Sequence, residues 1–332
     1  AGGVNTGVDT IQRKLNSVSL NAMIQNSNSA ADGLNSLNDP GMKLSTNMYD
    51  LQAITGVAGD KLKEIEGYAR QNAKTFGGDA SASAESYKLI LSQLSPEIAK
   101  MPKALQAMGK EVSVTSKLMG GDTVAATNVL TTAMNQYQVA LDDPIKASKE
   151  MARMNNVMAA AAKEGSAELP QIAQALEQSG LAAKTAGVSF EETNAFIQVL
   201  DKNGKKGAEG GVALRNVMAT LAQGRFLPKD TKAELAAAGV NIDTLTDSSL
   251  SLSDRLKPLK GIMNDQALVT KLFGKENSNA AIAMISNTDE ANRLTEAVTG
   301  TKTAYDQADV VMQSQEERNK RFKAQMNEIK IS

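Results

Sequence analysis

The stretch that most constrains the fold of this chain is residues 185–223, where two segments with helical periodicity flank a glycine-rich loop. Before the loop, Phe196 and Leu200 lie four positions apart, which places their side chains on one face of a helix. The loop, residues 201–211, contains four glycines and three lysines, and the apolar spacing resumes at Val212. The stretch therefore predicts a helix, a loop and a second helix.

Short signals mark where the helices of this stretch end and begin. Glycine adopts a left-handed backbone conformation at little cost, so Gly187 is expected to end a helix, with Val188 packing back on the last turn. Ser189 and Glu192 have the spacing of a capping box, which predicts that a new helix begins after Ser189. Residues 238–240 repeat the Ala-Gly-Val sequence of the first helix end and predict another.

The composition extends this helical prediction to the whole chain. Ala, Leu, Met, Gln and Lys are abundant, the 332 residues include only 7 prolines, and strand-like alternation of apolar and polar residues is nearly absent. We expect an all-α fold in which a helical domain is flanked by extended or coiled-coil helices. Since the sequence starts at Ala1 and not at methionine, we also expect a fragment of a longer polypeptide.

The chain contains no cysteine and no histidine. This excludes disulfides, zinc sites with the usual nitrogen and sulfur ligands, haem, iron–sulfur clusters, and Ser–His–Asp or Cys–His catalysis. Two pairs of carboxylates are adjacent in sequence, Glu191-Glu192 and Asp142-Asp143. On a helix the two side chains of each pair point about 100° apart, so they do not converge on one proton or metal ion. They are better explained as favourable charges at helix N-termini. We predict no catalytic residue, no metal site, no cofactor and no enzyme activity.

The charge balance argues against nucleic acid as a partner. The 36 basic and 37 acidic residues give a net charge of −1, whereas a general nucleic-acid binder carries a basic excess or stripe. Aromatic residues make up only 3% of the chain, too few for a platform on which bases stack. No apolar run approaches the roughly 20 residues that span a bilayer. We expect no sequence-specific nucleic-acid binding.

Two segments precede the main helical domain. Residues 1–43 are rich in Asn, Ser and Gly and predict a loosely ordered arm, with a disordered linker as the alternative. Residues 44–76 have heptad spacing, which predicts either a coiled-coil helix or an amphipathic helix against a globular core. The candidate seam of this segment consists of Leu44, Met48, Leu51, Leu62 and Ile65.

Residues 80–300 predict a multi-helix domain, and residues 304–332 predict a C-terminal coiled-coil helix. The second seam alternates spacings of four and three, and two of its positions are polar, which costs stability but fixes register. A surface helix with a modest apolar stripe is the alternative. We expect this seam to form the interface of a homo-oligomer, with a trimer as the first choice. Its residues are Ala308, Met312, Gln315, Asn319, Phe322, Met326 and Ile329.

The glycine-rich loop 201–211 allows more than one interpretation. A phosphate-binding loop is disfavoured, because the Gly-x-x-x-x-Gly-Lys-Ser/Thr spacing and a preceding strand are both missing. A plain turn between two helices is one interpretation. The other is contact with an acidic partner surface, because lysines stand before a helix N-terminus. The candidate partner-contact residues are Lys202, Lys205, Lys206, Gly207, Gly210 and Gly211.

The residues around this loop also resemble a known family. Residues 186–192 read Ala-Gly-Val-Ser-Phe-Glu-Glu, and residues 213–216 read Ala-Leu-Arg-Asn, with glycines at fixed intervals between them. In this order and spacing they resemble the phage tail tape measure family, in its TP901-like branch. The similarity covers about residues 140–330, and more loosely residues 80–140. Lys205-Lys206 departs from the family, which usually has an apolar residue there.

The resemblance implies a structural role in the tail of a bacteriophage or a phage-like particle. Members of the family lie along the lumen of the tail tube, and their helical length sets how many tube rings assemble. The implied partners are further copies of the chain, the tail tube, the tail tip or baseplate, and the host membrane at ejection. The implied location is the virion, in the tube lumen or at the tip, after assembly in the bacterial cytoplasm.

Two other classes of protein compete with this interpretation. Some tape measures carry peptidoglycan-cleaving segments, but these need a Cys–His pair, a zinc site or an acidic pair in a cleft, and the first two are impossible here. A helical surface adhesin, stalk or needle-type protein shares the composition. It is not expected to repeat the ordered Ser-x-Glu-Glu, glycine loop and Ala-Leu-Arg-Asn series. The resemblance therefore favours a tape measure fragment, and it implies that the protein is released at genome delivery.

Overall fold

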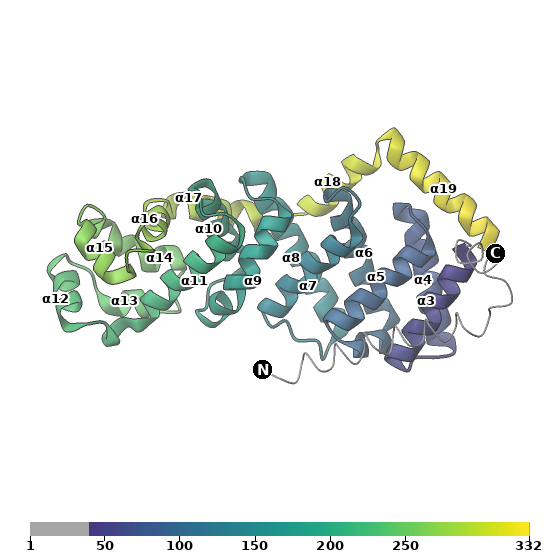
Figure 1. Ribbon diagram of the computed structural model, residues 1–332, viewed down its shortest axis with the longest axis horizontal. Coiled ribbons are helices and arrows are strands. Elements are labelled where there is room, and N and C mark those ends of the chain that lie inside the picture. Colours follow the sequence, from purple (N-terminus) through teal and green to yellow (C-terminus); the bar gives the residue numbers. More distant parts are fainter. Residues whose placement is uncertain (1–39, 332) are drawn as a thin grey trace. The chain divides into compact units, whose positions relative to one another are not determined.

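The computed structural model describes residues 40–331 (Figure 1). These residues form α-helices and short 3₁₀ helices joined by turns, and no strand is found among them. The prediction of an all-α fold is confirmed. Most of the arm expected over residues 1–43 lies outside the described residues, and the first described helix begins at Pro40.

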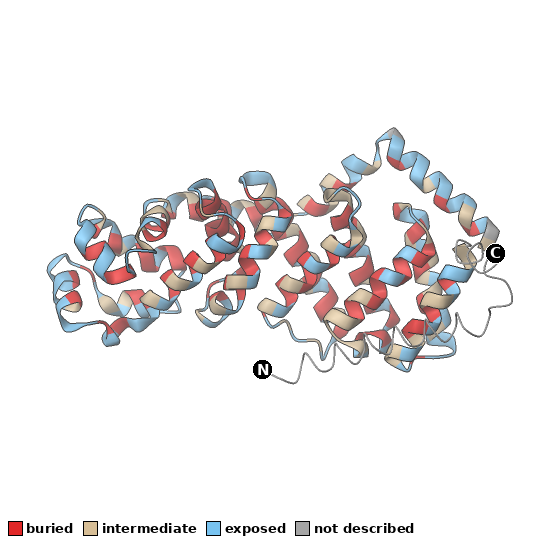
Figure 2. Cartoon of the chain, viewed as in Figure 1, coloured by how far each residue is buried: buried red, intermediate tan, exposed pale blue. Residues whose placement is uncertain are grey.

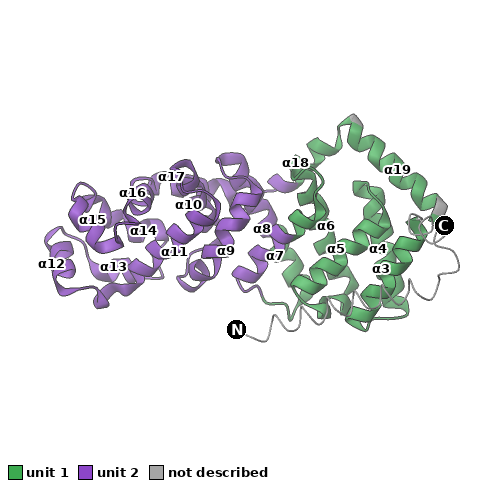
Figure 3. Ribbon diagram, viewed as in Figure 1, with its two compact units in different colours: residues 1–127, 140–152, 305–332 green, residues 128–139, 153–304 purple. Residues whose placement is uncertain are grey.

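The chain divides into two compact units (Figure 3). Unit 1 contains residues 1–127, 140–152 and 305–332, and unit 2 contains residues 128–139 and 153–304. These boundaries do not coincide with the segments expected from the sequence, because the helices within 44–76 and 304–332 share unit 1 with the first helices of the expected domain over 80–300.

The helices of unit 1 are α3 (Pro40–Thr55), α4 (Asp60–Phe76), α5 (Ala80–Gln93), η1 (Pro96–Lys100), α6 (Pro102–Leu118) and α19 (Gln315–Ile331). Those of unit 2 are α9 (Leu169–Thr185), α10 (Phe190–Lys202), α11 (Gly207–Gln223), η2 (Gly224–Phe226), α12 (Lys229–Ala237), α13 (Ile242–Thr246), α14 (Leu252–Leu256), η3 (Lys257–Ile262), α15 (Gln266–Phe273), α16 (Ser278–Ser286) and α17 (Thr288–Val298). Residues of both units occur in α7 (Thr123–Gln136), α8 (Pro144–Glu164) and α18 (Thr303–Met312).

The first candidate seam lies on two helices and not on one. Gly56 and Gly59 have positive φ angles of 69° and 62°, which favour glycine and interrupt the helix between α3 and α4. Both helices pack on α5 and bury their apolar faces in the core of unit 1. Four of the five seam residues are buried there and Leu62 is half-buried; the buried ones are Leu44, Met48, Leu51 and Ile65. This burial favours the amphipathic interpretation, because an intramolecular core already covers these residues.

The core of unit 2 is built around α9, α10 and α11, which pack on one another. Phe190 and Phe196 of α10 are buried, and the ring of Tyr137 meets Phe190 edge-on at a centroid distance of 5.1 Å. The Tyr137 hydroxyl also contacts the Thr193 hydroxyl at 2.6 Å. Figure 2 shows buried residues on the facing sides of these helices, whereas α19 of unit 1 is exposed over most of its length.

The helix ends expected from sequence are largely confirmed. Gly187 has a φ of 73°, and the amide of Val188 donates to the Ala183 carbonyl at 2.9 Å, the six-to-one bond of a Schellman motif. Gly239 ends α12 in the same way. The Ser189 hydroxyl accepts from the Glu192 amide at 3.1 Å and so caps α10.

The helix expected over residues 304–330 is also interrupted. α18 ends at Met312 and α19 begins at Gln315. The Ser314 hydroxyl accepts from the amide of Glu317 at 3.3 Å, so Ser314 starts a new helix instead of continuing the old one. Ser314 and Glu317 have the Ser-x-x-Glu spacing of a capping box. This helix-start signal lies within the heptad pattern, which by itself predicts a continuous helix.

Candidate functional site

The candidate functional features of the described residues are surfaces and one buried carboxylate. No group of three or more Asp or Glu side chains within residues 40–331 could hold a metal ion. Over the same range, no helix combines the length and the apolar character needed to cross a bilayer. The features that could carry function are therefore the C-terminal helix α19, the loop between α10 and α11, and a buried carboxylate at Glu192.

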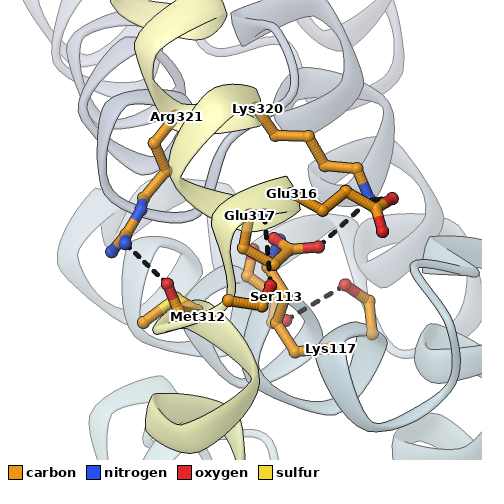
Figure 4. Close-up of polar contacts among 9 residues, drawn as sticks. Ser113, Lys117, Met312, Glu316, Glu317, Lys320 and Arg321 are labelled. Atoms are coloured by element: carbon orange, nitrogen blue, oxygen red, sulfur yellow. Dashed lines mark hydrogen bonds and ion pairs between the residues drawn. The ribbon is translucent and has the colours of Figure 1, made fainter.

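The helix α19 is held on unit 1 by its acidic residues. The Glu317 carboxylate forms an ion pair with Lys117 of α6, and both side chains are about 10% exposed (Figure 4). Lys320 adds a second ammonium group 3.0 Å from the same carboxylate. Burial alone would raise the pKa of Glu317, but the two ammonium groups outweigh burial and hold it below its usual range. This end of α19 is thus anchored by a largely desolvated charge cluster.

A second acidic anchor lies near the other end of α19. Glu328 is 3.0 Å from the guanidinium of Arg70 and 3.9 Å from the ammonium of Lys74, both on α4. Between the two anchors only Ala324 is a buried apolar residue, with 4% exposure. The docked face of α19 is therefore mainly ionic, and its attachment depends on charge more than on apolar burial.

Acid should loosen α19 before it loosens the helical cores. Because the folded pKa of Glu317 is depressed, its stabilising effect is present above the unfolded pKa of about 4.3 and is lost as the pH falls through the folded value. We expect amide exchange in α19, corrected for intrinsic rates, to accelerate when the pH is lowered from neutral to below about 4.3, while α10 stays protected. Glu317→Gln should give the same acceleration at neutral pH. Equal protection of α19 at both pH values in the unmodified chain would contradict this prediction.

The outward face of α19 carries an apolar stripe. Phe322, Met326 and Ile329 are 65%, 43% and 70% exposed. They belong to the second candidate seam, whose other residues have different surroundings: Ala308 is buried and Met312 half-buried on α18, and Asn319 is exposed on α19. The structure does not describe the side chain of Gln315. Self-association through this seam stays a prediction.

Two of the three lysines of the glycine-rich loop form ion pairs within the chain. Lys206 lies 3.1 Å from the buried carboxylate of Asp201, which also accepts from the Ser166 hydroxyl at 2.6 Å. Lys205 pairs with Glu209 at 2.9 Å. Lys202 is exposed at the end of α10. A partner could still reach Lys202 and Lys206, and this contact stays a prediction.

Sequence reasoning missed what the glycines of this loop do. A side chain on Gly211 would place Cβ 2.3 Å from the Ala175 carbonyl oxygen and 2.8 Å from its Cα, on α9. At Gly210, Cβ would lie 2.5 Å from the carbonyl oxygen of Lys205, and at Gly207 it would lie 2.5 Å from the side chain of Gln174. All three glycines lie in the first turns of α11 and not in a loop as expected. Gly207 and Gly211 allow α11 to approach α9 closely, and Gly210 allows the turn at Lys205 to pack against α11, so all three have a packing role.

Glu192, the second residue of the capping box, has a partner that could not be predicted from the sequence. Glu192 is 4% exposed, and its carboxylate accepts from the amides of Leu252 at 2.7 Å and Ser253 at 3.2 Å. It therefore joins α10 to the start of α14, about sixty residues further along the chain. Ser251 is the N-cap of α14, because its hydroxyl accepts from the Asp254 amide at 3.1 Å.

The chain is similar to one protein family and to two curated phage proteins. The sequence model of a family described as phage-related minor tail protein matches residues 70–274. The chain is 22% identical over 284 residues to the tape measure protein of Pneumococcus phage Dp-1, covering 82% of this chain and 23% of that protein. It is 25% identical over 272 residues to the probable tape measure protein of Escherichia phage P2, covering 78% of this chain and 31% of that protein.

The family model matches more than half of this chain. The matched region includes all of α9, α10 and α11, the helices around the glycine-rich loop. The chain spans only 23% and 31% of the lengths of the two curated relatives. No solved structure matches it. The TP901-like branch is not tested by these similarities and stays a prediction.

Proposed function

This chain belongs to the family of phage-related minor tail proteins, and from that membership we propose that it is a segment of a tail tape measure protein. A structural role in a phage tail, and hence a place in the virion, follows from the family. The observation that carries the more specific proposal is that both curated relatives are named tape measure proteins and match about four-fifths of this chain. The same match disfavours the alternative of an adhesin, stalk or needle-type protein.

We further propose that this segment contributes to tail length, contacts the tail tip or baseplate, and leaves with the genome. A ruler needs a fixed conversion of residue number into distance, which an α-helix supplies at about 1.5 Å per residue. The described chain is helical almost throughout, so most of its residues could contribute such a fixed rise. In two compact units, however, residue number does not translate into length. The ruler role therefore requires the helices to align along the tube.

This requirement predicts how an insertion changes the tail. Helical heptads can be inserted between Gln313 and Ser314, two exposed residues where α18 ends and α19 begins. If the segment lies extended along the tube, two, four and eight inserted heptads should lengthen the tail by about 20, 40 and 80 Å. Electron microscopy of purified tails measures this change.

A matched control inserts the same number of Gly and Ser residues at the same position, which form no helix and have no fixed rise. The helical series should give lengths proportional to residue number, and the Gly/Ser series should not. Tails of unchanged length in every helical variant, with the protein still incorporated, would remove the ruler role from this segment. They would leave a role at the tip or baseplate.

A further inference from the structure

The charges of α19 are sorted between its two faces. Its acidic residues are Glu316, Glu317 and Glu328. Glu317 and Glu328 face unit 1, where Lys117 and Arg70 pair with them, and Glu316 pairs with Lys320 at 3.0 Å within the helix. Folding thus pairs Glu317 and Glu328 with basic residues of α6 and α4. Glu316 is exposed on the flank of the helix, and its partner there is Lys320 of the same helix.

The apolar stripe lies in the middle of this outward face. At about 100° per residue, Phe322, Met326 and Ile329 fall within about 60° of the helix circumference, opposite the docked residues Glu317 and Ala324. Two exposed basic residues flank it: Arg318 lies beside the stripe on one side and Lys323 on the other. Such a narrow stripe with charged flanks is the geometry of a coiled-coil seam, whereas a helix that lies on a membrane presents a broader apolar face.

The flanking charges decide between possible occupants of the stripe. In a parallel coiled coil, a residue of one helix faces the residue five positions further along the other helix across the seam. A second copy of α19 would therefore bring Lys323 against Arg318, and like charges at these positions oppose pairing. A helix with acidic flanks would place a carboxylate against each of them and bury the apolar stripe as well.

We propose that the outward face of α19 is a docking surface for an acidic amphipathic helix of a partner protein. The apolar residues of that helix cover Phe322, Met326 and Ile329, and its Asp or Glu residues pair with Arg318 and Lys323. The docked acidic residues of α19 take no part, since unit 1 already pairs them. This proposal does not depend on the role in tail length.

Two synthetic helical peptides test the proposal on the whole chain. Both have Ile and Leu at the seam positions; one has Glu at every flanking position and the other has Lys. Fluorescence anisotropy should show saturable binding of the Glu peptide and at least about 30-fold weaker binding of the Lys peptide. Phe322→Asp should weaken binding of the Glu peptide by about 30-fold or more, because it places a charge in the centre of the contact. Added salt should weaken binding through the screening of the flanking pairs.

A charge reversal gives the matched control. The double variant Arg318→Glu, Lys323→Glu should reverse the preference, so that the Lys peptide binds and the Glu peptide does not. The double variant Lys63→Glu, Lys103→Glu makes the same change in net charge at exposed lysines of α4 and α6 and should leave the original preference intact. Circular dichroism confirms that each variant is folded.

Several results would overturn the proposal. Equal binding of both peptides, or none of the Glu peptide, would show that charge does not select the occupant. Sedimentation that shows an oligomer which Phe322→Asp converts to a monomer would assign the stripe to a second copy. Binding to vesicles of phosphatidylcholine and phosphatidylglycerol that Phe322→Asp abolishes, without binding of the Glu peptide, would assign it to a lipid surface.

Discussion

Replacing Gly211 with alanine should destabilise unit 2 by about 2–3 kcal/mol, because overpacking of a tight contact typically costs 1–3 kcal/mol. The added Cβ would lie 2.3 Å from the carbonyl oxygen of Ala175 and 2.8 Å from its Cα. These atoms belong to the backbone of α9, so no side-chain rotation can relieve the clash. α9 and α11 would have to move apart, and the core between them would lose contacts.

Hydrogen exchange of the α9 and α11 amides measures this loss locally, and 2–3 kcal/mol corresponds to about 30- to 150-fold faster exchange. Gly67→Ala is the matched control, because Gly67 lies inside α4 and its added Cβ would meet no atom within 4 Å. That change should stabilise α4 by up to about 1 kcal/mol through helix propensity. If both substitutions had the same small effect, the close approach of α9 and α11 would not constrain position 211.

Removing the carboxylate of Glu192 should cost about 3 kcal/mol. The carboxylate is buried and accepts two backbone hydrogen bonds at the start of α14. A hydrogen bond to a charged group contributes about 1.5–3 kcal/mol, and Glu192→Ala would leave two buried amides without their acceptor. The buried Arg255 guanidinium would also lose a nearby negative charge, since Glu192 opposes the lowering of its pKa by burial.

Urea denaturation followed by far-ultraviolet circular dichroism, with exchange of the Leu252 and Ser253 amides, would measure this effect. Glu192→Gln keeps the shape but has a single acceptor oxygen, so we expect an intermediate loss of about 1–2 kcal/mol. Glu209→Ala removes an exposed carboxylate whose pair with Lys205 is on the surface, and it should cost less than about 1 kcal/mol. An equal loss for Glu192→Ala and Glu209→Ala would show that the buried cap contributes nothing.

Local signals predicted the helix ends well because their partners are close in sequence. The Ser189 cap and the Gly187 helix end each use atoms within five residues, so the residue types alone specify them. The break between α18 and α19 belongs to the same class. The Ser314 and Glu317 pair is present in the sequence, but the heptad spacing continues across it and predicts an unbroken helix.

Features with distant partners could not be predicted in the same way. The partner of Glu192 lies at Leu252, and the partner of Gly211 lies at Ala175 on another helix. In the sequence, a glycine that forms a turn, one that contacts a ligand and one that allows two helices to cross cannot be told apart. The three roles are distinguished only by which atoms lie beside the glycine in the fold. For that reason the sequence could place the candidate loop 201–211 but not assign its glycines to packing.

Heptad spacing alone could not separate a core from an interface either. Leu44, Met48 and Leu51 have the same spacing as Phe322, Met326 and Ile329, yet the first three are buried in unit 1 and the last three are exposed. The difference depends on what the rest of each helix, outside its apolar face, contacts. α19 turns its carboxylates towards the basic residues of α4 and α6, and this leaves its apolar residues outside.

The order in which the two units occur along the chain also sets an order of synthesis. Unit 2 ends at residue 304, whereas unit 1 is completed only by residues 305–332. A ribosome therefore synthesises every residue of unit 2 before it makes α19. During that interval Lys117 and Arg70 have no acidic partner from α19. Of the described helices, α19 is thus made last, and it neutralises a basic surface on a unit whose first helices have already been made.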